Sequence, residues 1–482
     1  MQINRILLLL ITVILAVILF SSAFSSTISP GSLEITLNND TTAPVSFQNQ
    51  TQFTVLLSPE PDSLAILNEK IQKYTGTISS DSGLLNFRVA DRYFNSVNEA
   101  LSELKGGVVS DYFSVNESQP VLTDLLYSNV TPYQIAPFAY TPSMIASAYN
   151  FTQAYANNDY GQGITIGIVD AYGDPNIQYD LNAFDHMNEL PPINLSIYYP
   201  SGKPLSVSRQ WAIETSTDVE WAHAMAPQAS IKLFVVPNDG LTALMNATSM
   251  VISHNLANVI SLSWGVPESS ISSAEIGTYS EMIQQAQFRG ISVVAASGDQ
   301  GALDGTTTPT VNFPASDPYI LSVGGTSLSF LNKNVVIQEG WGGNISGKTY
   351  GSGGGFSKYF SKPSYQDGIK NITNMRGVPD VAMDADNYTG VQVITGGGQY
   401  RIGGTSIGTP IWSAVIALMD SADNTTIGSP DPLFYQIYHS NYYNMSFTQV
   451  YYGSNGYYSN SAGWNPVTGL GTPNVWQLIL SS

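Results

Sequence analysis

Hydrophobic residues in the second part of the chain form short, nearly continuous runs. Five of these runs are rich in β-branched residues and lie at 163–172, 229–237, 258–265, 290–298 and 319–325. A strand that is buried on both faces has an unbroken apolar run of this kind, and helical patterns separate the runs. The pattern predicts an α/β fold with a parallel sheet, helices on both faces, and a site at the carboxyl ends of the strands.

The region before these runs has a different pattern. Strand-like stretches at 53–58 and 85–90 alternate with helical stretches at 62–74 and 96–104, which is typical of a small α+β domain. A segment rich in Ser, Asn and Pro follows from Val108 to about Phe138. We expect it to form an exposed linker.

The first 26 residues are predicted to be a secretory signal. They contain one Arg, an apolar run from Ile6 to Phe20, and small residues up to a cleavage point near Ser25 or Ser26. A retained membrane anchor is the alternative interpretation. The chain has no Cys, so no disulfide stabilises it. Asn-x-Ser/Thr sequons predict a glycosylated surface, among them Asn116, Asn194, Asn344 and Asn424.

Charge is sparse in this chain of 482 residues. Charged residues make up 11% of it, against roughly 25% in ordinary soluble proteins. The net charge of −19 argues against nucleic acid or an anionic membrane as a partner. In strong acid the chain would carry at most 21 positive charges, from 17 Lys and Arg and four His. Self-repulsion would stay modest, so the composition permits a compact fold in acid.

The stretch "GGTSIGTPIWSA" at 403–414 makes Ser406 a candidate nucleophile. Its GTSIG core also matches the serine elbow of α/β-hydrolases, for which Asp431 and His439 could complete a triad. That elbow needs a buried strand before the serine, and "TGGGQYRIGG" does not predict one. We expect instead a helix after Ser406, with Pro410 near its first turn.

A nucleophilic serine needs a base, and the chain has only four His. Glu214 and Asp218 in "QWAIETSTDVEWAHAM" lie four residues apart, so a helix places them about 40° apart on one face. His223 falls on the opposite face and is interpreted as a packing or surface residue. Two neighbouring carboxyls cannot both ionise easily, so the pair can serve as base and orienting partner. Two acids on a solvated helix face remain the alternative.

Asp299 in "VVAASGDQGA" follows directly after a predicted buried strand, at the carboxyl end of the sheet. An unpaired acid there would be costly unless it has a role. A protonated Asp299 could donate a hydrogen bond to a developing oxyanion. A simple turn around Asp-Gln-Gly is the alternative.

Taken together with "NVISLSWG", "GITIGIVDAYGDP", "RGVPDVAMDAD" and "GWNPVTGLGTPN", these motifs closely resemble the sedolisins, the serine-carboxyl peptidases with a subtilisin-like fold. The resemblance runs from about Ala136 to the C-terminus. It implies that Ser406 is the nucleophile, Glu214 the general base, Asp218 its orienting carboxylate and Asp299 the oxyanion acid. Asp170 and Trp264 are implied as supporting members of the hydrogen-bond network.

The resemblance also implies an organisation for the whole chain. Residues 1–26 would be the signal peptide, 27–135 a small α+β, ferredoxin-like activation propeptide, and 136–482 the peptidase domain. The product would be a secreted, extracellular, acid-active endopeptidase, monomeric and made as a self-processing zymogen that binds its own propeptide and protein or peptide substrates. The alternative is an inactive homologue acting as a secreted binding glycoprotein, although all four catalytic positions are filled.

Two further expectations concern ions and pH. Sedolisins bind calcium near the C-terminus through two Asp side chains, but the matching positions here hold Gln449 and Asn465. Because calcium affinity depends on ligand charge, we expect no metal cofactor, although the carbonyls of Val450 and Gly463 could hold a weak calcium site. We also expect acids of the linker, together with the catalytic carboxylates, to be protonated as pH falls, which would weaken the hold of the propeptide.

Overall fold

The computed structural model describes residues 50–57, 63–75, 84–90, 109–116 and 139–481, except 194, 333, 334, 346 and 347, with five helical residues between 97 and 104. The predicted signal peptide and most of the predicted linker lie outside the described residues. The chain divides into two compact units, which are described separately. Among the described residues, no helix is both long enough and apolar enough to cross a bilayer.

The N-terminal unit contains a three-stranded sheet in the order β2-β1-β3. Strand β1 (Gln50–Leu57) pairs antiparallel with β2 (Leu84–Ala90), and helix α2 (Ser63–Thr75) buries Leu67 and Ile71 one turn apart. Strand β3 (Val109–Asn116) corrects the prediction that the linker begins at Val108. Its period-two alternation of apolar and polar residues was concealed by the abundance of Ser and Asn.

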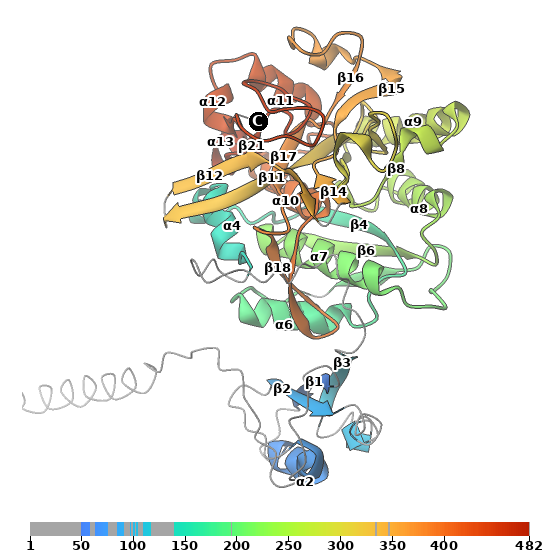
Figure 1. Cartoon of the computed structure of the whole chain (residues 1–482), viewed down its shortest axis with the longest axis vertical. Coiled ribbons are helices and arrows are strands. Elements are labelled where there is room, and N and C mark those ends of the chain that lie inside the picture. Colours follow the sequence, from blue (N-terminus) through green and yellow to red (C-terminus); the bar gives the residue numbers. More distant parts are fainter. Residues whose placement is uncertain are drawn as a thin grey trace, which may run out of the picture. The chain divides into compact units, whose positions relative to one another are not determined.

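The larger unit is built on an eight-stranded sheet in the order β12-β11-β9-β7-β4-β6-β5, with β17 beside β11. Figure 1 labels β4, β6, β11, β12 and β17 of this sheet. Every pairing is parallel except that between β11 and β12. The five predicted strands all occur, so the predicted parallel sheet is confirmed. The strands are β4 (Thr165–Ala171), β5 (Ser196–Tyr198), β6 (Ser230–Val236), β7 (Val259–Leu262), β9 (Ser292–Ala296), β11 (Leu321–Asn332), β12 (Val335–Gly340) and β17 (Val381–Asp384).

Helices cover both faces of this sheet, as predicted. One face packs on α7 (Arg209–Met225) and α10 (Thr405–Asp423), and the other on α8 (Leu241–Ser253) and α9 (Ser273–Phe288); α6 (Ile177–Met187) packs on α7. Alternation along β4 supplies both cores, because Ile166 and Ile168 join the first while Val169 and Ala171 join the second. The sheet is therefore buried on both sides, which explains the continuous apolar runs.

Helix α10 differs from the prediction in two respects. It begins at Thr405, so Ser406 lies in its first turn, and Pro410 lies inside the helix. Every residue from 405 to 420 is buried, so the helix has no solvated face. Strand β19 (Gly398–Ile402) precedes it and forms an antiparallel hairpin with β18 (Val391–Thr395) outside the central sheet. This arrangement agrees with rejection of the hydrolase elbow, which needs a buried sheet strand there.

Shorter elements complete the larger unit. They are α4 (Pro142–Ala148), α5 (Phe151–Ala156), β8 (Val266–Pro267), η2 (Glu268–Ser270), η3 (Gly301–Leu303), β10 (Asn312–Phe313), β13 (Gly342–Ile345), β14 (Lys348–Gly351), β15 (Gly355–Ser361), η4 (Ser364–Gln366), β16 (Met375–Val378), α11 (Asp431–Tyr438), α12 (Tyr443–Ser446), β20 (Phe447–Thr448), β21 (Thr472–Pro473) and α13 (Val475–Ile479).

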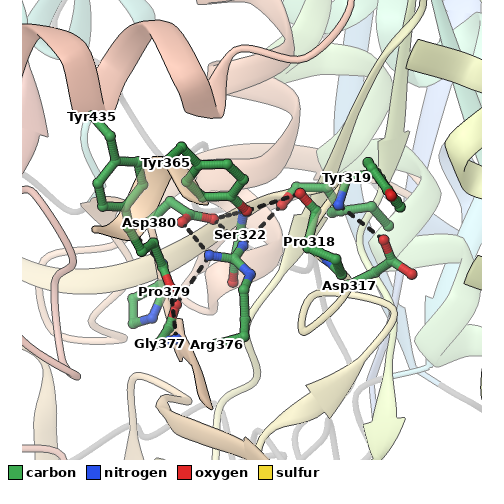
Figure 2. Close-up of polar contacts among 12 residues, drawn as sticks. Asp317, Pro318, Tyr319, Ser322, Tyr365, Arg376, Gly377, Pro379, Asp380 and Tyr435 are labelled. Atoms are coloured by element: carbon green, nitrogen blue, oxygen red, sulfur yellow. Dashed lines mark hydrogen bonds and ion pairs between the residues drawn. The ribbon is translucent and has the colours of Figure 1, made fainter. Parts of the chain in front are cut away.

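A buried ion pair anchors the segment between β16 and β17 (Figure 2). Both terminal nitrogens of Arg376 donate to Asp380, each at 2.6 Å, and both residues are fully buried. Asp380 also accepts from the Tyr435 hydroxyl at 2.9 Å and from the Ser322 backbone N–H at 2.9 Å. We call Arg376, Asp380, Tyr435 and Ser322 the arginine cluster. It joins β11, β16 and α11 and satisfies the buried carboxylate.

Candidate active site

The predicted catalytic residues and Asp170 come from four separate parts of the fold. Glu214 and Asp218 lie on α7, Asp170 lies in β4, Asp299 follows β9, and Ser406 lies in the first turn of α10. The strand-borne residues stand at or just beyond the carboxyl ends of their strands, where sites gather in parallel sheets. Contacts between the two helices and the central strands hold these elements together.

A cleft of about 360 Å³ opens between these elements. Glu214, Asp299 and Ser406 line it, together with Trp264 and Asp304. Asp170 and Asp218 are fully buried behind it. The cleft thus gives a ligand access to Ser406, Glu214 and Asp299, while Asp170 and Asp218 remain shielded from solvent.

Gly404 brings the serine close to Asp299. Its φ of 134° suits glycine, and a Cβ added there would lie 2.9 Å from Asp299 Oδ2 and 3.1 Å from Ser406 Oγ. The two oxygens therefore border the same small space, which a larger residue would fill. The glycines of "GGTS" thus have a steric function beside the serine.

Thr405 fixes which oxygen of Asp299 is available. Its backbone N–H and its hydroxyl donate to Asp299 Oδ1 at 2.7 and 2.8 Å, while the hydroxyl accepts from the Gly298 N–H at 3.1 Å. Oδ1 is thereby occupied, which leaves Oδ2 to carry a proton toward the space beside Ser406. Burial raises the pKa of Asp299, which favours that protonated form, although the bonds from Thr405 oppose the shift.

Glu214 is the carboxyl next to the serine. Burial, followed by the negative charge of Asp170, raises the pKa of Glu214 to about 8, and the hydrogen bond with Ser406 opposes this shift. The charge of Asp299 acts in the same direction as that of Asp170. While Asp170 and Asp299 are protonated they carry no charge, so they do not raise the pKa of Glu214 in this way. The first proton to leave this network is therefore lost more easily than later ones.

Asp218 is connected to the serine through a residue that the sequence analysis missed. The Ser263 hydroxyl donates to Asp218 Oδ1 at 2.7 Å and lies 3.3 Å from the Ser406 carbonyl oxygen. Pro410 has no N–H with which to bond that carbonyl, so the helix leaves it free. One hydroxyl proton cannot serve both acceptors, so both bonds form together only when Asp218 is protonated and donates to Ser263.

The pKa values of the two buried acids agree with this arrangement. Burial, then the charges of Asp170 and Glu214, raise the pKa of Asp218 well above its usual range. Burial likewise raises the pKa of Asp170 to about 7, against hydrogen bonds from Thr215 and Asp218. Ser263 could have been found from sequence, since it lies near the end of the predicted run 258–265, immediately before Trp264.

Trp264 contributes differently from the expectation. Its indole N–H donates to the Val169 carbonyl at 2.7 Å, not to a carboxyl. It therefore ties the end of β7 to β4 beside Asp170 while lining the cleft. The bond fixes the ring as part of the cleft wall.

No described histidine lines the cleft. His223 is buried on α7, with Nε2 2.8 Å from the Pro191 carbonyl and 3.3 Å from Asp185, as expected for a packing residue. Asp431 and His439 do not meet the serine either. Asp431 lies in the electrostatic surroundings of the arginine cluster, and His439 contacts the Asp367 carbonyl.

The two amides expected to replace calcium ligands make their own loop contacts. Asn465 Oδ1 accepts from the N–H groups of Val467 and Thr468, both at 3.0 Å. Gln449 Oε1 accepts from the Gly463 N–H at 2.8 Å. Because backbone donors already occupy these oxygens, the two amide side chains do not fit the role of calcium ligands.

One part of the pH expectation is wrong. The catalytic carboxyls were expected to lose favourable ionic contacts in acid, which requires lowered pKa values. Their pKa values are raised instead, because burial penalises the charged form. Protonation in acid therefore stabilises the buried form of these carboxyls. It does not by itself weaken a contact between them and the propeptide.

Comparisons with known proteins agree with this fold and site. A model of the subtilase family matches residues 212–462, just over half of the chain. Kumamolisin from Bacillus sp. (strain MN-32) is 31% identical over 357 residues, which cover 70% of this chain and 62% of that protein. Sedolisin from Pseudomonas sp. (strain 101) is 29% identical over 338 residues, which cover 65% of this chain and 57% of that protein.

A solved structure gives the same result. Pseudomonas sedolisin, complexed with two molecules of pseudo-iodotyrostatin, has a TM-score of 0.66 at 27% identity and covers 72% of this chain and 98% of that chain. The curated relatives are longer, since the match spans 57% to 62% of their lengths.

The parallel sheet and the buried serine-bearing helix define a subtilisin-like protein. The chain belongs to the subtilase family of serine-type peptidases and, within it, to the sedolisins.

Proposed function

We propose that this chain is a secreted, acid-active serine-carboxyl endopeptidase that hydrolyses proteins through an acyl-enzyme on Ser406. The observation that carries this proposal is the meeting of Ser406 Oγ and Asp299 Oδ2 beside Gly404, in an open cleft that Glu214 also lines. Nucleophile, base and oxyanion acid need this proximity.

The reaction follows from these positions. Glu214 takes the Ser406 proton as Oγ attacks the substrate carbonyl carbon. The oxyanion receives hydrogen bonds from protonated Asp299 and from the Ser406 backbone N–H, which has no partner within the first turn of α10. Glu214 then gives its proton to the leaving amine, and the C–N bond breaks. Water hydrolyses the ester with Glu214 again as base, which restores Ser406.

Acid activity follows from the protons that this mechanism needs. Asp299 must be protonated to donate to the oxyanion, and it loses that proton as pH rises through its raised pKa. Asp218 must hold Ser263 and Glu214 in place while Glu214 carries the single negative charge of the network. A network with one charge exists at lower pH than a network with two, so we expect activity to fall as pH rises toward neutrality.

We further propose that the chain is made as a zymogen. Residues 27–135 would be a propeptide that covers the cleft and is removed by the enzyme itself in acid. The three-stranded sheet of the N-terminal unit supports a folded propeptide. Secretion, a monomeric state and glycosylation belong to the same proposal, and the exposed Asn424 offers one accessible sequon.

The test incubates purified precursor at about pH 7 and about pH 4, followed by sequencing of the new amino terminus and assay of a protein substrate. We expect cleavage between residues 108 and 145 and activity only in acid. Ser406→Ala, the matched control, should remain uncut and inactive. Full activity of uncut precursor would refute the zymogen. Undiminished proteolysis by Ser406→Ala would revive the alternative of an inactive homologue with a binding role, or would place the catalytic site elsewhere.

A further inference from the structure

A second group of buried carboxyls lies outside the cleft lining. Asp174 follows β4, Asp180 lies on α6 and Glu220 lies on α7, and each is at most 7% exposed. None of the three lines the cleft, and the proposed reaction does not use them. We call Asp174, Asp180 and Glu220 the hairpin carboxyls, because two of them accept hydrogen bonds from the β18–β19 hairpin.

Asp180 binds the turn of this hairpin. Its Oδ2 accepts from the Gly396 N–H at 2.9 Å, and its Oδ1 accepts from the Gly397 N–H at 3.0 Å. Both glycines have a positive φ, of 50° and 66°, as a two-residue hairpin turn requires. Glu220 Oε2 accepts from the Ile394 N–H at 3.0 Å, just before the turn. Carboxyl oxygens therefore attach the hairpin to both α6 and α7.

Asp174 joins this arrangement through a hydrogen bond with Asp180. Its Oδ1 accepts from the Asn176 N–H at 2.8 Å, and its Oδ2 accepts from the Ser216 hydroxyl at 2.9 Å. Two carboxyls can hydrogen-bond each other only when one of them carries a proton. Burial, followed by the charge of Asp174, raises the pKa of Asp180 to about 9, although the bonds from the two glycines oppose this shift. The folded protein therefore retains the shared proton in acid and at neutral pH.

The charges around this pair are mostly negative. Burial raises the pKa of Glu220 well above its usual range, and the charges of three acids add to this shift. They are Asp174, Asp180 and Asp185. His223, which lies 3.3 Å from Asp185, is buried, and burial lowers its pKa. Among these neighbours only Arg401 of β19 has a fixed positive charge, and it lowers the pKa of Tyr140, which pairs with Val391 at the open end of the hairpin.

The hairpin leads directly into the serine-bearing helix. Strand β19 and α10 are separated only by Gly403 and Gly404. Gly404 borders the small space between Asp299 Oδ2 and Ser406 Oγ. A displacement of β19 would therefore move the segment that sets this space. The attachment of the hairpin to α6 and α7 thus bears on the geometry of the proposed nucleophile.

We propose that Asp174 and Asp180 are positioning residues, which share one proton, hold the β18–β19 hairpin on α6 and thereby place the first turn of α10. Loss of the proton would leave two buried anions in contact, and they separate when the hairpin turn opens to water. The importance of this hold for catalysis rests on the proposed peptidase function. The opening of the hairpin does not depend on that function.

The pH dependence has a definite sign. Asp180 has a raised pKa while the hairpin is closed, and an ordinary value near 4 once it is open to water. The hold is therefore complete near pH 4 and weakens as pH rises toward the raised pKa. The equilibrium constant for opening should increase over that range by up to about tenfold per pH unit.

Hydrogen exchange of the full-length Ser406→Ala chain measures this opening. Exchange of the segment 391–402 is followed from about pH 5 to about pH 8 and divided by the intrinsic rate at each pH, which gives the equilibrium constant for opening. We expect this constant to rise at least about tenfold, the segment 403–408 to share the rise, and α9 as the reference to rise less. A constant value for 391–402 would overturn the proposal. A rise that 403–408 does not share would overturn the placement of α10.

Asp174→Asn tests whether the shared proton causes the rise. The amide can donate to Asp180 at every pH and does not ionise, so exchange of the hairpin should rise no more than that of α9. The matched control is Asp420→Asn, which removes another buried acid whose pKa burial raises to about 7, and which should keep the full rise. An unchanged rise in Asp174→Asn would overturn the proposal. Free exchange of that variant at every pH would show a purely structural role and would overturn it as well.

The active enzyme gives a separate measurement. Mature wild type and Asp174→Asn are incubated at about pH 8 and assayed after return to about pH 4, so that direct titration of the catalytic carboxyls cancels. The half-life of activity should be at least about threefold longer in the variant. Equal half-lives would overturn the role of the hairpin in inactivation. Absence of any Ser406-dependent hydrolysis would instead overturn the proposed function, whereas the exchange of the inactive chain would still test the shared proton.

Discussion

Two groups of buried carboxyls in the larger unit are stabilised in opposite ways. In the arginine cluster, Arg376 meets Asp380 with two bonds of 2.6 Å, and both side chains are fully buried. In the catalytic network, the described neighbours of Asp170, Glu214 and Asp218 are hydroxyls and other carboxyls, and the described lining of the cleft contains no basic residue. The first group holds a compensated charge, and the second holds protons.

The difference follows from what each group is proposed to do. A carboxylate paired with a buried guanidinium is a stable cross-link, because removal of either partner would leave the other charge buried and uncompensated. A network without a cation cannot ionise fully, so its protons remain available for transfer and for hydrogen bonds to an oxyanion. A cation beside Glu214 would make it a weaker base. The separation of Arg376 from the cleft lining is therefore as important as its presence.

The largest effect that we expect is the loss of activity in Glu214→Gln, which removes the base from the catalytic network. The amide cannot accept the serine proton, so kcat should fall by about 10²–10⁴-fold, with loss of self-processing, while circular dichroism and the melting temperature remain close to those of wild type. The matched control is Glu220→Gln on the same helix, buried but absent from the cleft lining. Unchanged kcat in Glu214→Gln would exclude Glu214 as the base.

Arg376→Met tests the ion pair of the arginine cluster. Removing the cation leaves Asp380 buried without its charge partner, so urea denaturation should show a loss of about 3–5 kcal/mol in the free energy of unfolding. Adding Asp380→Asn should restore part of this loss, because the amide needs no counter-charge. A double variant no more stable than the single one would show that Arg376 acts through packing alone.

The pH dependence of stability should reveal the uncompensated carboxyls. Burial raises the pKa of Asp317 and of Asp420 to about 7, as it does for Asp170. With an unfolded pKa near 4, the native state binds more protons between pH 4 and 7. Stability is then full near pH 4 and falls as pH rises toward 7, by about 2 kcal/mol or more.

Denaturation midpoints at pH 4 and pH 7 measure this slope. Asp317→Asn is the matched variant, since Asn can still accept from the Tyr319 N–H that Asp317 Oδ1 accepts at 2.9 Å. Its slope should be flatter than that of wild type. Stability that rises from pH 4 to 7 would contradict the assigned direction of these pKa values.

The smallest expected effect is that of a chelator. Because backbone N–H groups occupy the amide oxygens of Asn465 and Gln449, EDTA should change the melting temperature by less than about 1 °C. Thermal unfolding with and without EDTA, with added magnesium as the control for ionic strength, measures this. A large drop that only calcium reverses would show that carbonyls such as those of Val450 and Gly463 bind the ion.

Local pattern was sufficient for much of the fold and for the choice of candidate residues. Unbroken apolar runs are a direct consequence of strands buried on both faces, so the parallel sheet could be predicted from them. Helical spacing alone places Glu214 and Asp218 on one face and His223 on the other. Strand β3 was missed because its alternation is weak in a segment of polar composition, where a linker is equally consistent with the residues.

Tertiary structure decided which residues far apart in the sequence contact one another. Thr405 reaches Asp299 across 106 residues of sequence, and Ser263 bridges to Asp218 across 45, so the orientation of both acids depends on how β7, β9, α7 and α10 pack. The direction of each pKa shift is likewise a property of burial, of neighbouring carboxyls and of hydrogen bonds between distant elements, which no local spacing encodes. The sequence by itself therefore determined which carboxyls and hydroxyls are available for the site. The packing of distant elements decided how these groups are oriented and in which direction their pKa values shift.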